Sequence, residues 1–303
     1  MSRTVFLGTS EFAGTVLEHL AESAHRPALV VTPPDRPKGR GKRLQQPPAA
    51  AEAARLDLHL WQTPDVNADE ATERIRGARP DAVIVCAFGQ IIRDPLLSEW
   101  PLLNVHPSLL PRWRGAAPIE RAIMAGDATT GVCVMELVAE LDAGPVALCE
   151  ETPVGDDDYG ALAGRLANQG GELLVTALSR LESGQLSFRE QDFAGITYAE
   201  KIDRDERHLD PSRPSAELER TVRALTPHIG AYLEVGESER LGVRQASVVD
   251  EPSPAGEISV REGALILGCG EGALRLEVVQ APGGRPISAE DYLRGNEAPT
   301  RAT

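Results

Sequence analysis

The sequence has no long apolar run, few cysteines and no cluster of potential metal ligands. No apolar stretch approaches the roughly 20 residues that a helix needs to cross a bilayer, and no signal peptide precedes the strand-like segment TVFLG at Thr4. The cysteines, at positions 86, 133, 149 and 269, show no CxxC spacing, and the six histidines are dispersed. We therefore expect a cytoplasmic protein without a metal site, whose four cysteines are unpaired, buried small residues in a reducing compartment.

Positive charge is scarce, and lysine is almost absent. Lys plus Arg number 31 against 46 Asp plus Glu, which gives a formal net charge of −15, and only three of the basic residues are lysines. This balance argues against a protein that binds nucleic acid over its whole surface. A local basic element is present, because residues 36–43 carry five cations and no acid, so that the rest of the chain sums to −20. A charge run of this kind is either a solvated loop or a contact for phosphate.

Short apolar strands alternate with helical patterns in the first half of the chain. The expected strands are 4–8, 28–32, 81–87, 102–105, 131–137 and 145–151. Apolar residues recur every three or four positions over 12–20, over 118–125 and over 159–181, which predicts three helices. The alternation predicts an α/β fold with a Rossmann-like, mostly parallel sheet that is covered on both faces.

The pattern changes in the second half of the chain. A mixed polar stretch near residues 183–207 is interpreted as a linker, and a helix at 215–225 precedes five short strands with Gly and Pro between them. Such strands predict a small OB-like β-barrel. A chain of 303 residues is about twice the usual domain size. We expect a catalytic domain at 1–187, a linker at 188–206 and an OB-like domain at 207–303.

The turn after the first strand reads GTSEFAG. It lacks the GxGxxG spacing of a dinucleotide-binding turn, which disfavours a nicotinamide-dependent oxidoreductase. The turn still lies where a ligand crevice would be found in such a sheet.

Three polar residues are candidates for catalysis. Asn104 and His106 lie at the end of a predicted strand, where open α/β sheets bind ligands, and a spacing of two lets both project to one side. An Asn amide can donate to a developing oxyanion, and a His transfers protons near neutral pH. Asp142, in the turn ELDAGP, could orient and charge His106. The residues alone leave structural roles open: capping groups for the first two and a turn aspartate for the third. No Ser or Cys has a nucleophile context, which favours direct transfer over a covalent enzyme intermediate.

Five segments together resemble the 10-formyltetrahydrofolate-dependent formyltransferases. They are GTSEFA at 8–13, PPDRPKGRGKRLQQP at 33–47, NVHPSLLPRWRGAAP at 104–118, LDAGP at 141–145 and TYAEKI at 197–202. NVHPSLLP is shared by several folate-dependent formyltransferases, whereas RWRGAAP and the basic segment resemble the members that formylate methionyl-tRNA. The resemblance covers nearly the whole chain.

The resemblance implies transfer of a formyl group from 10-formyltetrahydrofolate, a cosubstrate, to the free α-amine of initiator methionyl-tRNA. Asn104 and protonated His106 would stabilise the tetrahedral oxyanion, and Asp142 would hold His106 or relay the proton of the amine through water. The implied folate contacts are Phe88, Gly89, Gln90, Ile91, Ile92, Ser108, Leu109, Leu110, Pro111, Val138 and Leu141. The implied tRNA contacts are Arg36, Lys38, Arg40, Lys42 and Arg43, of which Arg40 and Lys42 would be the most important. No metal and no membrane are implied, and we expect a monomer.

The chain departs from the family pattern at several positions. Glu140 and Ala143 replace a common Gly and Thr beside Asp142, Ser10 replaces a Pro, and His228 and Ile229 replace a common Trp and Pro. Glu140 cannot adopt a glycine-only backbone conformation as cheaply, so the folate contacts there could differ. Residues 207–303 contain 11 arginines, no lysine and 15 acids. A tRNA contact in this region would depend on a subset of arginines such as Arg213, Arg220, Arg223, Arg240 and Arg244.

Two other functions remain open from the sequence. A formyltransferase acting on a small amine would explain NVHPSLLP but would leave the basic segment and the second domain without a use. A non-catalytic tRNA-binding relative would explain those two features but would not need Asn104, His106 and Asp142.

Overall fold

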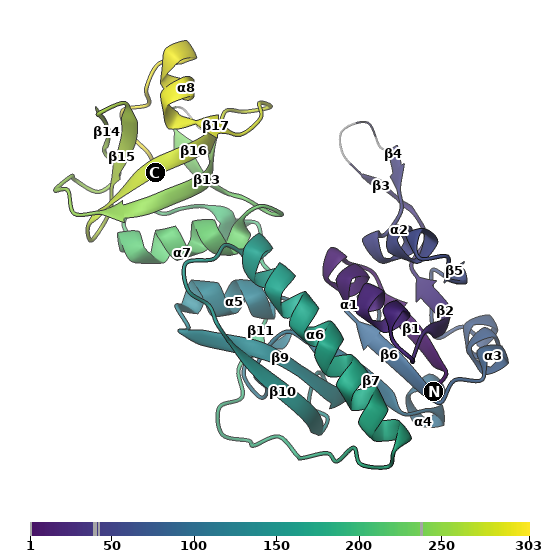
Figure 1. Cartoon of the computed structure of the whole chain (residues 1–303). Helices are drawn as coiled ribbons and strands as arrows, with labels where there is room; N and C mark the ends of the chain where they lie inside the picture. The colour runs from purple at the N-terminus through teal and green to yellow at the C-terminus, as the bar shows by residue number, and fades with distance from the viewer. Residues whose placement is uncertain (1, 39–40, 42, 237–238) are drawn as a thin grey trace. The chain divides into compact units, whose positions relative to one another are not determined.

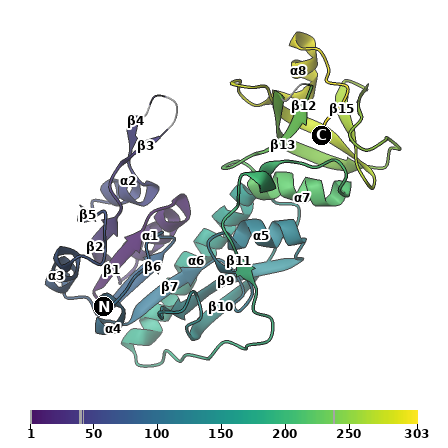
Figure 2. The same cartoon turned by 180° about the vertical axis from the view of Figure 1, so that it is seen from behind.

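The chain folds into two compact units, which are described separately. The computed structural model describes residues 2–38, 41, 43–236 and 239–303. Unit 1 consists of Met1–Pro118, Thr129–Pro153 and Ala163–Ala199, and unit 2 of Ile119–Ala128, Val154–Leu162 and Glu200–Thr303 (Figures 1 and 2). Two short segments from the middle of the sequence therefore belong to unit 2.

A seven-stranded sheet forms the framework of unit 1, in the order β10-β9-β7-β6-β1-β2-β5. Its strands are β1 (Thr4–Gly8), β2 (Pro27–Thr32), β5 (Leu60–Gln62), β6 (Ala82–Cys86), β7 (Leu102–His106), β9 (Thr129–Glu136) and β10 (Val146–Pro153). The first five run parallel, β9 is antiparallel to β7, and β10 is antiparallel to β9. All residues of β1, β6 and β7 are buried, as expected for parallel strands covered on both faces. The predicted mostly parallel sheet is confirmed.

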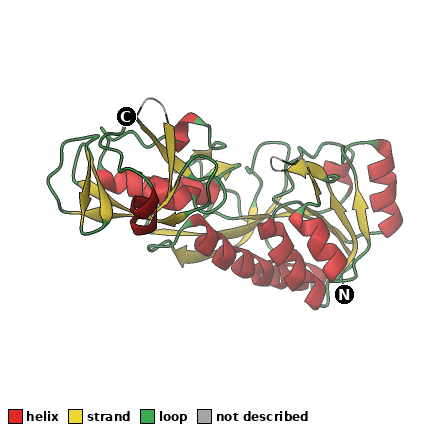
Figure 3. Cartoon of the chain, turned by 90° about the horizontal axis from the view of Figure 1, so that it is seen from above, coloured by secondary structure: helices red, strands yellow, loops and turns green. Residues whose placement is uncertain are grey.

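Helices cover both faces of this sheet (Figures 1 and 3). They are α1 (Glu11–Glu22), α2 (Pro48–Arg55), α3 (Asp69–Ala78), α4 (Leu96–Glu99) and α6 (Tyr159–Glu182). Helices α3 and α4 pack on one face through Ile75 and Leu96. On the other face α6 lies against β7 and β9, since a Cβ on Gly170 would contact Val105 and Val132. Because side chains alternate along a strand, the neighbours of Val105 in β7 point to the face opposite α6.

Ser10 begins α1 and explains one departure from the family pattern. Its hydroxyl accepts a hydrogen bond from the amide of Ala13 at 3.3 Å, and Glu11 follows in the first turn. A side-chain cap and an acidic first turn both stabilise a helix N-terminus.

The basic segment forms a separate two-stranded hairpin rather than an irregular loop. Strands β3 (Arg36–Lys38) and β4 (Arg43–Gln45) are antiparallel, with Arg36 opposite Gln45. Every residue of β4 is exposed, and Figure 1 shows the hairpin extending beyond α2. Arg40 and Lys42 lie outside the described residues. The exposure of β4 is consistent with both interpretations of the charge run, a solvated segment and a contact for phosphate.

The cysteines differ from the sequence-based prediction. Cys133 of β9 and Cys149 of β10 form a disulfide, and Cys149 is exposed. The expectation of four unpaired, buried cysteines is therefore wrong for this pair. The two residues are 16 apart in sequence, and the register of the two strands places them directly opposite each other. Cys86 and Cys269 are free and buried; burial raises the pKa of the Cys86 thiol and raises that of Cys269 to about 11.

Unit 2 contains an antiparallel β domain. Its helices are α5 (Pro118–Ala125), which starts at the edge of unit 1, the 3₁₀ helix Asp205–Arg207, α7 (Ser215–Leu225) and α8 (Ala289–Gly295). Its strands are β12 (Ala231–Val235), β13 (Glu239–Val249), β14 (Ile258–Arg261), β15 (Ala264–Gly268), β16 (Ala273–Gln280) and β17 (Ile287–Ser288). The order is β12-β13-β16-β15-β14, and β17 pairs with β16. Among the described residues, no helix is both long and apolar enough to cross a membrane.

The last residues of the chain connect the two edge strands of this sheet. Ala302 bridges Val235 at the end of β12, and Arg301 bridges Glu257 beside β14. Backbone hydrogen bonds from Ala302 to Gly256 at 2.8 Å and from Thr303 to Glu234 at 3.0 Å accompany these bridges. The strands thus approach the closed, OB-like arrangement that the sequence predicts.

His228, which stands where the family commonly has Trp, joins three segments of unit 2. Its ring stacks on Tyr159 with centroids 3.7 Å apart, and its Nε2 lies 2.9 Å from Oε1 of Glu120. The stacked ring retains an aromatic contact at this position, and its polar edge satisfies the buried carboxylate of Glu120.

His25 makes the stability of unit 1 depend on pH. The residue is 2% exposed; its Nδ1 accepts from the amide of Ser2 at 3.4 Å, and its Nε2 lies 3.1 Å from the hydroxyl of Ser179. Burial lowers the pKa of His25 below its ordinary value of 6.5. The unfolded state therefore takes up a proton at a higher pH than the folded state, and stability falls as the pH drops below 6.5.

We expect the variant His25→Gln to reduce this pH dependence. The free energy of unfolding, measured by urea denaturation from about pH 8 to about pH 5, should fall less steeply in the variant than in the parent chain. His59→Gln, at an exposed position, is the control. Equal slopes for His25→Gln and the parent chain would contradict the prediction.

Candidate active site

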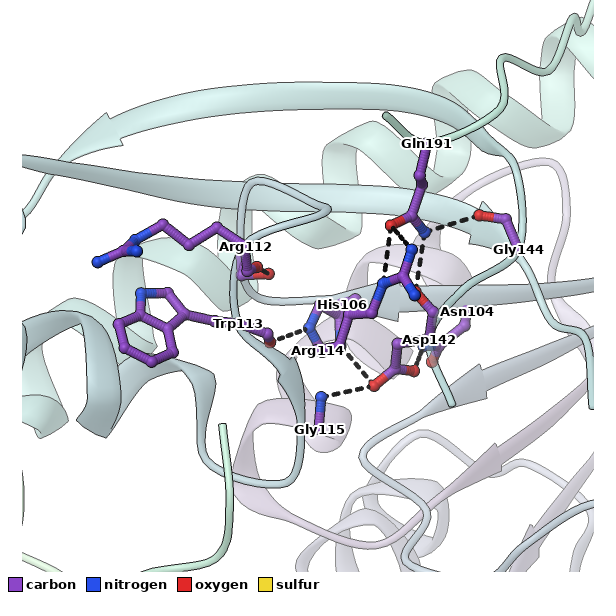
Figure 4. A network of polar contacts seen from close by, with 10 residues as sticks. Asn104, His106, Arg112, Trp113, Arg114, Gly115, Asp142, Gly144 and Gln191 are labelled. Atoms are coloured by element: carbon purple, nitrogen blue, oxygen red, sulfur yellow. Dashed lines mark hydrogen bonds and ion pairs between the residues drawn. The ribbon is translucent and has the colours of Figure 1, made fainter. Parts of the chain in front are cut away.

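The structure brings the three predicted catalytic residues together in unit 1. Asn104 and His106 lie in β7 on the face opposite α6, and Asp142 lies in the turn between β9 and β10. Asn104 donates from Nδ2 to Oδ1 of Asp142 at 3.5 Å, and Nδ1 of His106 lies 3.7 Å from Oδ2 of Asp142 (Figure 4). All three residues are no more than 9% exposed. The strand spacing and the turn therefore create one buried polar cluster.

A backbone carbonyl fixes the orientation of the His106 ring. Nε2 of His106 lies 2.9 Å from the carbonyl oxygen of Trp113 (Figure 4). Because a carbonyl only accepts, Nε2 must carry a hydrogen and Nδ1 is the nitrogen that gains or loses a proton. A proton on Nδ1 would face the carboxylate of Asp142 at ion-pair distance. A protonated ring would therefore carry a positive charge that is paired with this carboxylate.

The carboxylate of Asp142 is held by a neighbouring strand. The amide of Gly115, in β8 (Arg114–Gly115), donates to Oδ2 of Asp142 at 2.9 Å. Strand β8 pairs with β11 (Tyr198–Ala199), and a Cβ on Gly115 would lie 2.8 Å from the carbonyl oxygen of Ala199. Only glycine fits this close approach.

The turn around Asp142 is tight, and its left-handed residue is Asp142 itself. Asp142 has φ of 44°, a conformation that Asp tolerates better than most residues, whereas Glu140 has no positive φ. A Cβ on Gly144 would lie 1.9 Å from the carbonyl oxygen of Glu136, so this position requires glycine. Glu140 therefore needs no glycine-like backbone here.

Two further polar residues belong to this cluster and were missed from the sequence. Arg114 is 4% exposed and donates from Nε and Nη2 to Oε1 of Gln191 at 3.1 and 2.9 Å. Nε2 of Gln191 donates to the carbonyl oxygens of Asp142 and Gly144, both at 2.8 Å (Figure 4). The motif RWRGAAP could have drawn attention to Arg114. Nothing in the sequence distinguishes Gln191 from its polar neighbours.

The segment Phe88–Ile92 follows β6 beside the catalytic end of β7. Val85 pairs with Asn104, so the residues after β6 lie next to His106. The hydroxyl of Thr9, which follows β1, donates to the carbonyl oxygen of Phe88 at 2.6 Å. The carboxyl ends of β1, β6 and β7 therefore meet beside the catalytic cluster, where open α/β sheets bind ligands.

The segment offers groups that suit a flat, amide-edged ligand such as the pterin of folate. Ile91 and, in the Asp142 turn, Leu141 are 71% and 58% exposed, and a Cβ on Gly89 would meet nothing within 4 Å. Oε1 of Gln90 accepts from the amide of Val66, whereas its Nε2 is buried without a hydrogen-bond partner in the described structure. An unused buried donor beside exposed apolar side chains fits such a ligand.

Other predicted folate positions have local structural roles. Ser108 is fully buried and donates from its hydroxyl to the carbonyl oxygen of Arg112 at 2.6 Å. Phe88 and Ile92 belong to the core under the sheet. Leu109 packs against Gly131. The positions Leu110, Pro111 and Val138 are half-buried.

The arginines of unit 2 that the sequence singled out all have intramolecular partners. Arg213 pairs with Glu217 and Arg223 pairs with Glu219. Arg220 donates to the carbonyl of Met124, Arg240 lies over the ring of Tyr232, and Arg244 donates to Gln280. Within the described residues, no group of three or more His, Cys, Asp or Glu side chains could hold a metal ion.

Residues 2–178 match the formyl transferase family, and residues 201–297 match the C-terminal domain of formyl transferases. The chain belongs to the formyl transferase family. It is 43% identical over 299 residues to a methionyl-tRNA formyltransferase from Halorhodospira halophila, covering 97% of this chain and 96% of that protein. A methionyl-tRNA formyltransferase from Sinorhizobium medicae is 42% identical over 302 residues, with coverage of 97% and 96%. The predicted family and enzyme class are confirmed.

Solved structures of distant relatives share the fold of this formyl transferase. HypX from Aquifex aeolicus in complex with tetrahydrofolic acid aligns with a TM-score of 0.69 and 18% identity, over all of this chain and 50% of that one. An N-formyltransferase from Helicobacter canadensis, in complex with folinic acid and dTDP-3-aminofucose, aligns with a TM-score of 0.67 and 14% identity, over 91% of this chain and 99% of that one. The predicted fold class, a Rossmann-like domain followed by an antiparallel β domain, is confirmed.

Proposed function

We propose that this formyl transferase moves the formyl group of 10-formyltetrahydrofolate to the free α-amine of initiator methionyl-tRNA, which yields N-formylmethionyl-tRNA for translation initiation. The observation that carries the proposal is full-length similarity to proteins named methionyl-tRNA formyltransferase. The buried cluster of Asn104, His106 and Asp142 supports a catalytic role over simple tRNA binding. A small amine as acceptor would leave the basic hairpin without a partner.

The residues of the cluster have distinct proposed roles. 10-Formyltetrahydrofolate supplies the formyl carbon, to which the amine nitrogen bonds. Asn104 gives one amide hydrogen to Asp142 and has a second hydrogen for the developing oxyanion. His106, protonated at Nδ1, adds positive charge beside the same oxygen. Asp142 takes up the proton that the amine loses, directly or through water, and gives it to N10 as the bond between N10 and the formyl carbon breaks.

The binding surfaces follow from the same proposal. We assign the folate to the exposed side of Phe88–Ile92, the segment 108–111, and the residues Val138 and Leu141. We assign the acceptor end of the tRNA to the basic segment 36–43, whose cations are Arg36, Lys38, Arg40, Lys42 and Arg43. Phosphate contact is the physical reason for clustering five cations in a chain of net charge −15.

A transfer assay tests the proposed function directly. The purified chain is given 10-formyltetrahydrofolate and methionyl-tRNA, with uncharged tRNA, an aminosugar nucleotide and glycinamide ribonucleotide as parallel acceptors. We expect formylation of methionyl-tRNA alone. Transfer only to a small amine would support the first alternative, and tRNA binding without any transfer would support a non-catalytic relative.

The remaining assignments are part of the same proposal. We propose domain boundaries at 1–187, 188–206 and 207–303, a monomeric state and a cytoplasmic location. A substrate that serves translation supports the cytoplasmic location. The monomeric state is tested by light scattering on the protein as it elutes from a size-exclusion column, because the measured mass should equal the chain mass of 32.5 kDa.

A further inference from the structure

We propose that Gln191 is a positioning residue that fixes the carboxylate of Asp142 for formyl transfer. The inference rests on the proposed function of this site. Gln191 lies in the segment that the sequence analysis interpreted as a linker, yet its side chain reaches the catalytic turn (Figure 4). It touches neither His106 nor Asn104, so its effect on the reaction is transmitted through Asp142.

The amide of Gln191 makes four hydrogen bonds. Nε2 gives both hydrogens to the carbonyl oxygens of Asp142 and Gly144, each at 2.8 Å. Oε1 accepts from Nε and Nη2 of Arg114 at 3.1 and 2.9 Å. Carbonyls only accept and guanidinium nitrogens only donate, so the amide has one possible orientation. Glutamine is the side chain that matches both sets of partners at once.

These bonds connect the two segments that hold the carboxylate of Asp142. One pair of bonds fixes the turn that carries Asp142. The other pair fixes the side chain of Arg114, whose neighbour Gly115 donates to Oδ2 of Asp142 at 2.9 Å. Gln191 therefore links the backbone of the Asp142 turn to Arg114 in β8, the strand whose Gly115 amide binds the Asp142 carboxylate.

Burial makes the link to Arg114 important. Arg114 is 4% exposed, and its ion pair with Glu140, at 3.7 Å from Nη1, is with a side chain that is 74% exposed. A buried guanidinium that loses its acceptor must find another one, at a cost in free energy. Without the Gln191 amide, Arg114 would lose its acceptor, and Arg114 and the Asp142 turn would lose the amide that binds both of them.

The segment around Gln191 is itself anchored to unit 1. Arg189 and Val146 exchange two backbone hydrogen bonds at 2.8 and 2.9 Å. Thr197 accepts from the amide of Trp113 at 2.9 Å through its hydroxyl oxygen. The carbonyl of Trp113 is the acceptor for His106. The chain is therefore anchored on both sides of Gln191, at Arg189 and at Thr197, so the Gln191 side chain can hold the Asp142 turn in place.

Two variants at position 191 test the hydrogen bonds of its amide. Gln191→Glu keeps an acceptor for Arg114 but places an oxygen against two carbonyls, and Gln191→Met removes both interactions. The control is Gln169→Glu: Gln169 is a half-buried glutamine of α6 that contacts Thr152 and Glu151, on β10. We expect kcat to fall on the order of 10- to 100-fold in both variants at position 191, with KM for each substrate within about threefold. The control should stay within about twofold of the parent chain in kcat.

The amide of Gly115 provides a measurement that does not depend on activity. In Gln191→Met its NMR chemical shift should change and its hydrogen exchange should accelerate by about tenfold or more, because its acceptor is no longer fixed. The amide of Val134, which pairs with Val105 in the main sheet, should keep its exchange rate. No change at Gly115 together with kcat within about twofold of the parent would overturn the proposal.

Two further outcomes distinguish a specific role of Gln191 from general loosening of the sheet and from failure of the proposed function. Faster exchange at Val134 as well would show general loosening of the sheet and would overturn a specific role for Gln191. If the parent chain does not formylate methionyl-tRNA, the proposed function fails, while the amide of Gly115 still reports whether Gln191 fixes Asp142.

Discussion

Replacing Asn104 with alanine should slow formyl transfer on the order of a hundredfold or more. Asn104 is 7% exposed, and its amide donates one hydrogen to Asp142; in the proposed function the second hydrogen is for the oxyanion. A single oxyanion donor is typically worth about 2.7–4 kcal/mol in the barrier. Because the interaction forms only in the transition state, kcat should fall while KM for both substrates changes little. Steady-state kinetics with methionyl-tRNA and 10-formyltetrahydrofolate measure both quantities.

A matched control separates this effect from general damage. Asn168 of α6 also uses its amide in hydrogen bonds, to the carbonyl of Gly164 at 2.8 Å and to His19 at 3.0 Å, at an exposed position. Asn168→Ala should keep kcat within about twofold of the parent chain. If Asn104→Ala retained activity within a few-fold of the parent while remaining folded, Asn104 would have no place in the mechanism.

The clustering of the three proposed catalytic residues could be predicted because their positions depend on local rules. A spacing of two residues on a strand places Asn104 and His106 on one face, and the end of a parallel strand is where ligands bind. The left-handed conformation of Asp142 suits an Asp in a short turn. Local geometry and strand order are enough to bring these three side chains near each other.

Gln191 and Arg114 could not be found in this way because their contacts are not local. Gln191 reaches Arg114, Asp142 and Gly144 across 77, 49 and 47 residues of sequence. The polar stretch around Gln191 has the composition of a linker, and only the tertiary fold places it against the turn. Composition predicts exposure well and long-range hydrogen bonds poorly.

The register of paired strands could not be predicted from the sequence either. The strands that contain Cys133 and Cys149 were both predicted, but their pairing depends on which residues face each other across the ladder. The same limit applies to the basic segment, where charge and glycine content predict an exposed element and the pairing of Arg36 with Gln45 makes it a hairpin. Elements were therefore predicted more reliably than the contacts between them.

Neutralising Arg40 and Lys42 together should flatten the salt dependence of tRNA binding by about two units on a log–log plot. Each cation that contacts phosphate releases counterions, and these two belong to the five cations of a segment without acids. The rest of the chain sums to −20 and repels the tRNA backbone, so binding depends heavily on this segment. Binding of methionyl-tRNA to the double variant Arg40→Gln, Lys42→Gln, measured across a salt series, tests the expectation.

A charge-matched pair elsewhere on unit 1 shows whether the location of the cations matters. Arg79 and Arg180 are exposed and distant in sequence from the hairpin, so Arg79→Gln, Arg180→Gln changes net charge equally. That variant should keep the slope of the parent chain, and both variants should bind the folate cosubstrate with unchanged affinity. An unchanged slope for the hairpin variant would mean that the net charge of −15 is the better guide and that these two cations do not contact phosphate. Loss of folate binding in the variant Arg40→Gln, Lys42→Gln would instead show that the two substitutions do not act on tRNA binding alone, which would contradict the assignment.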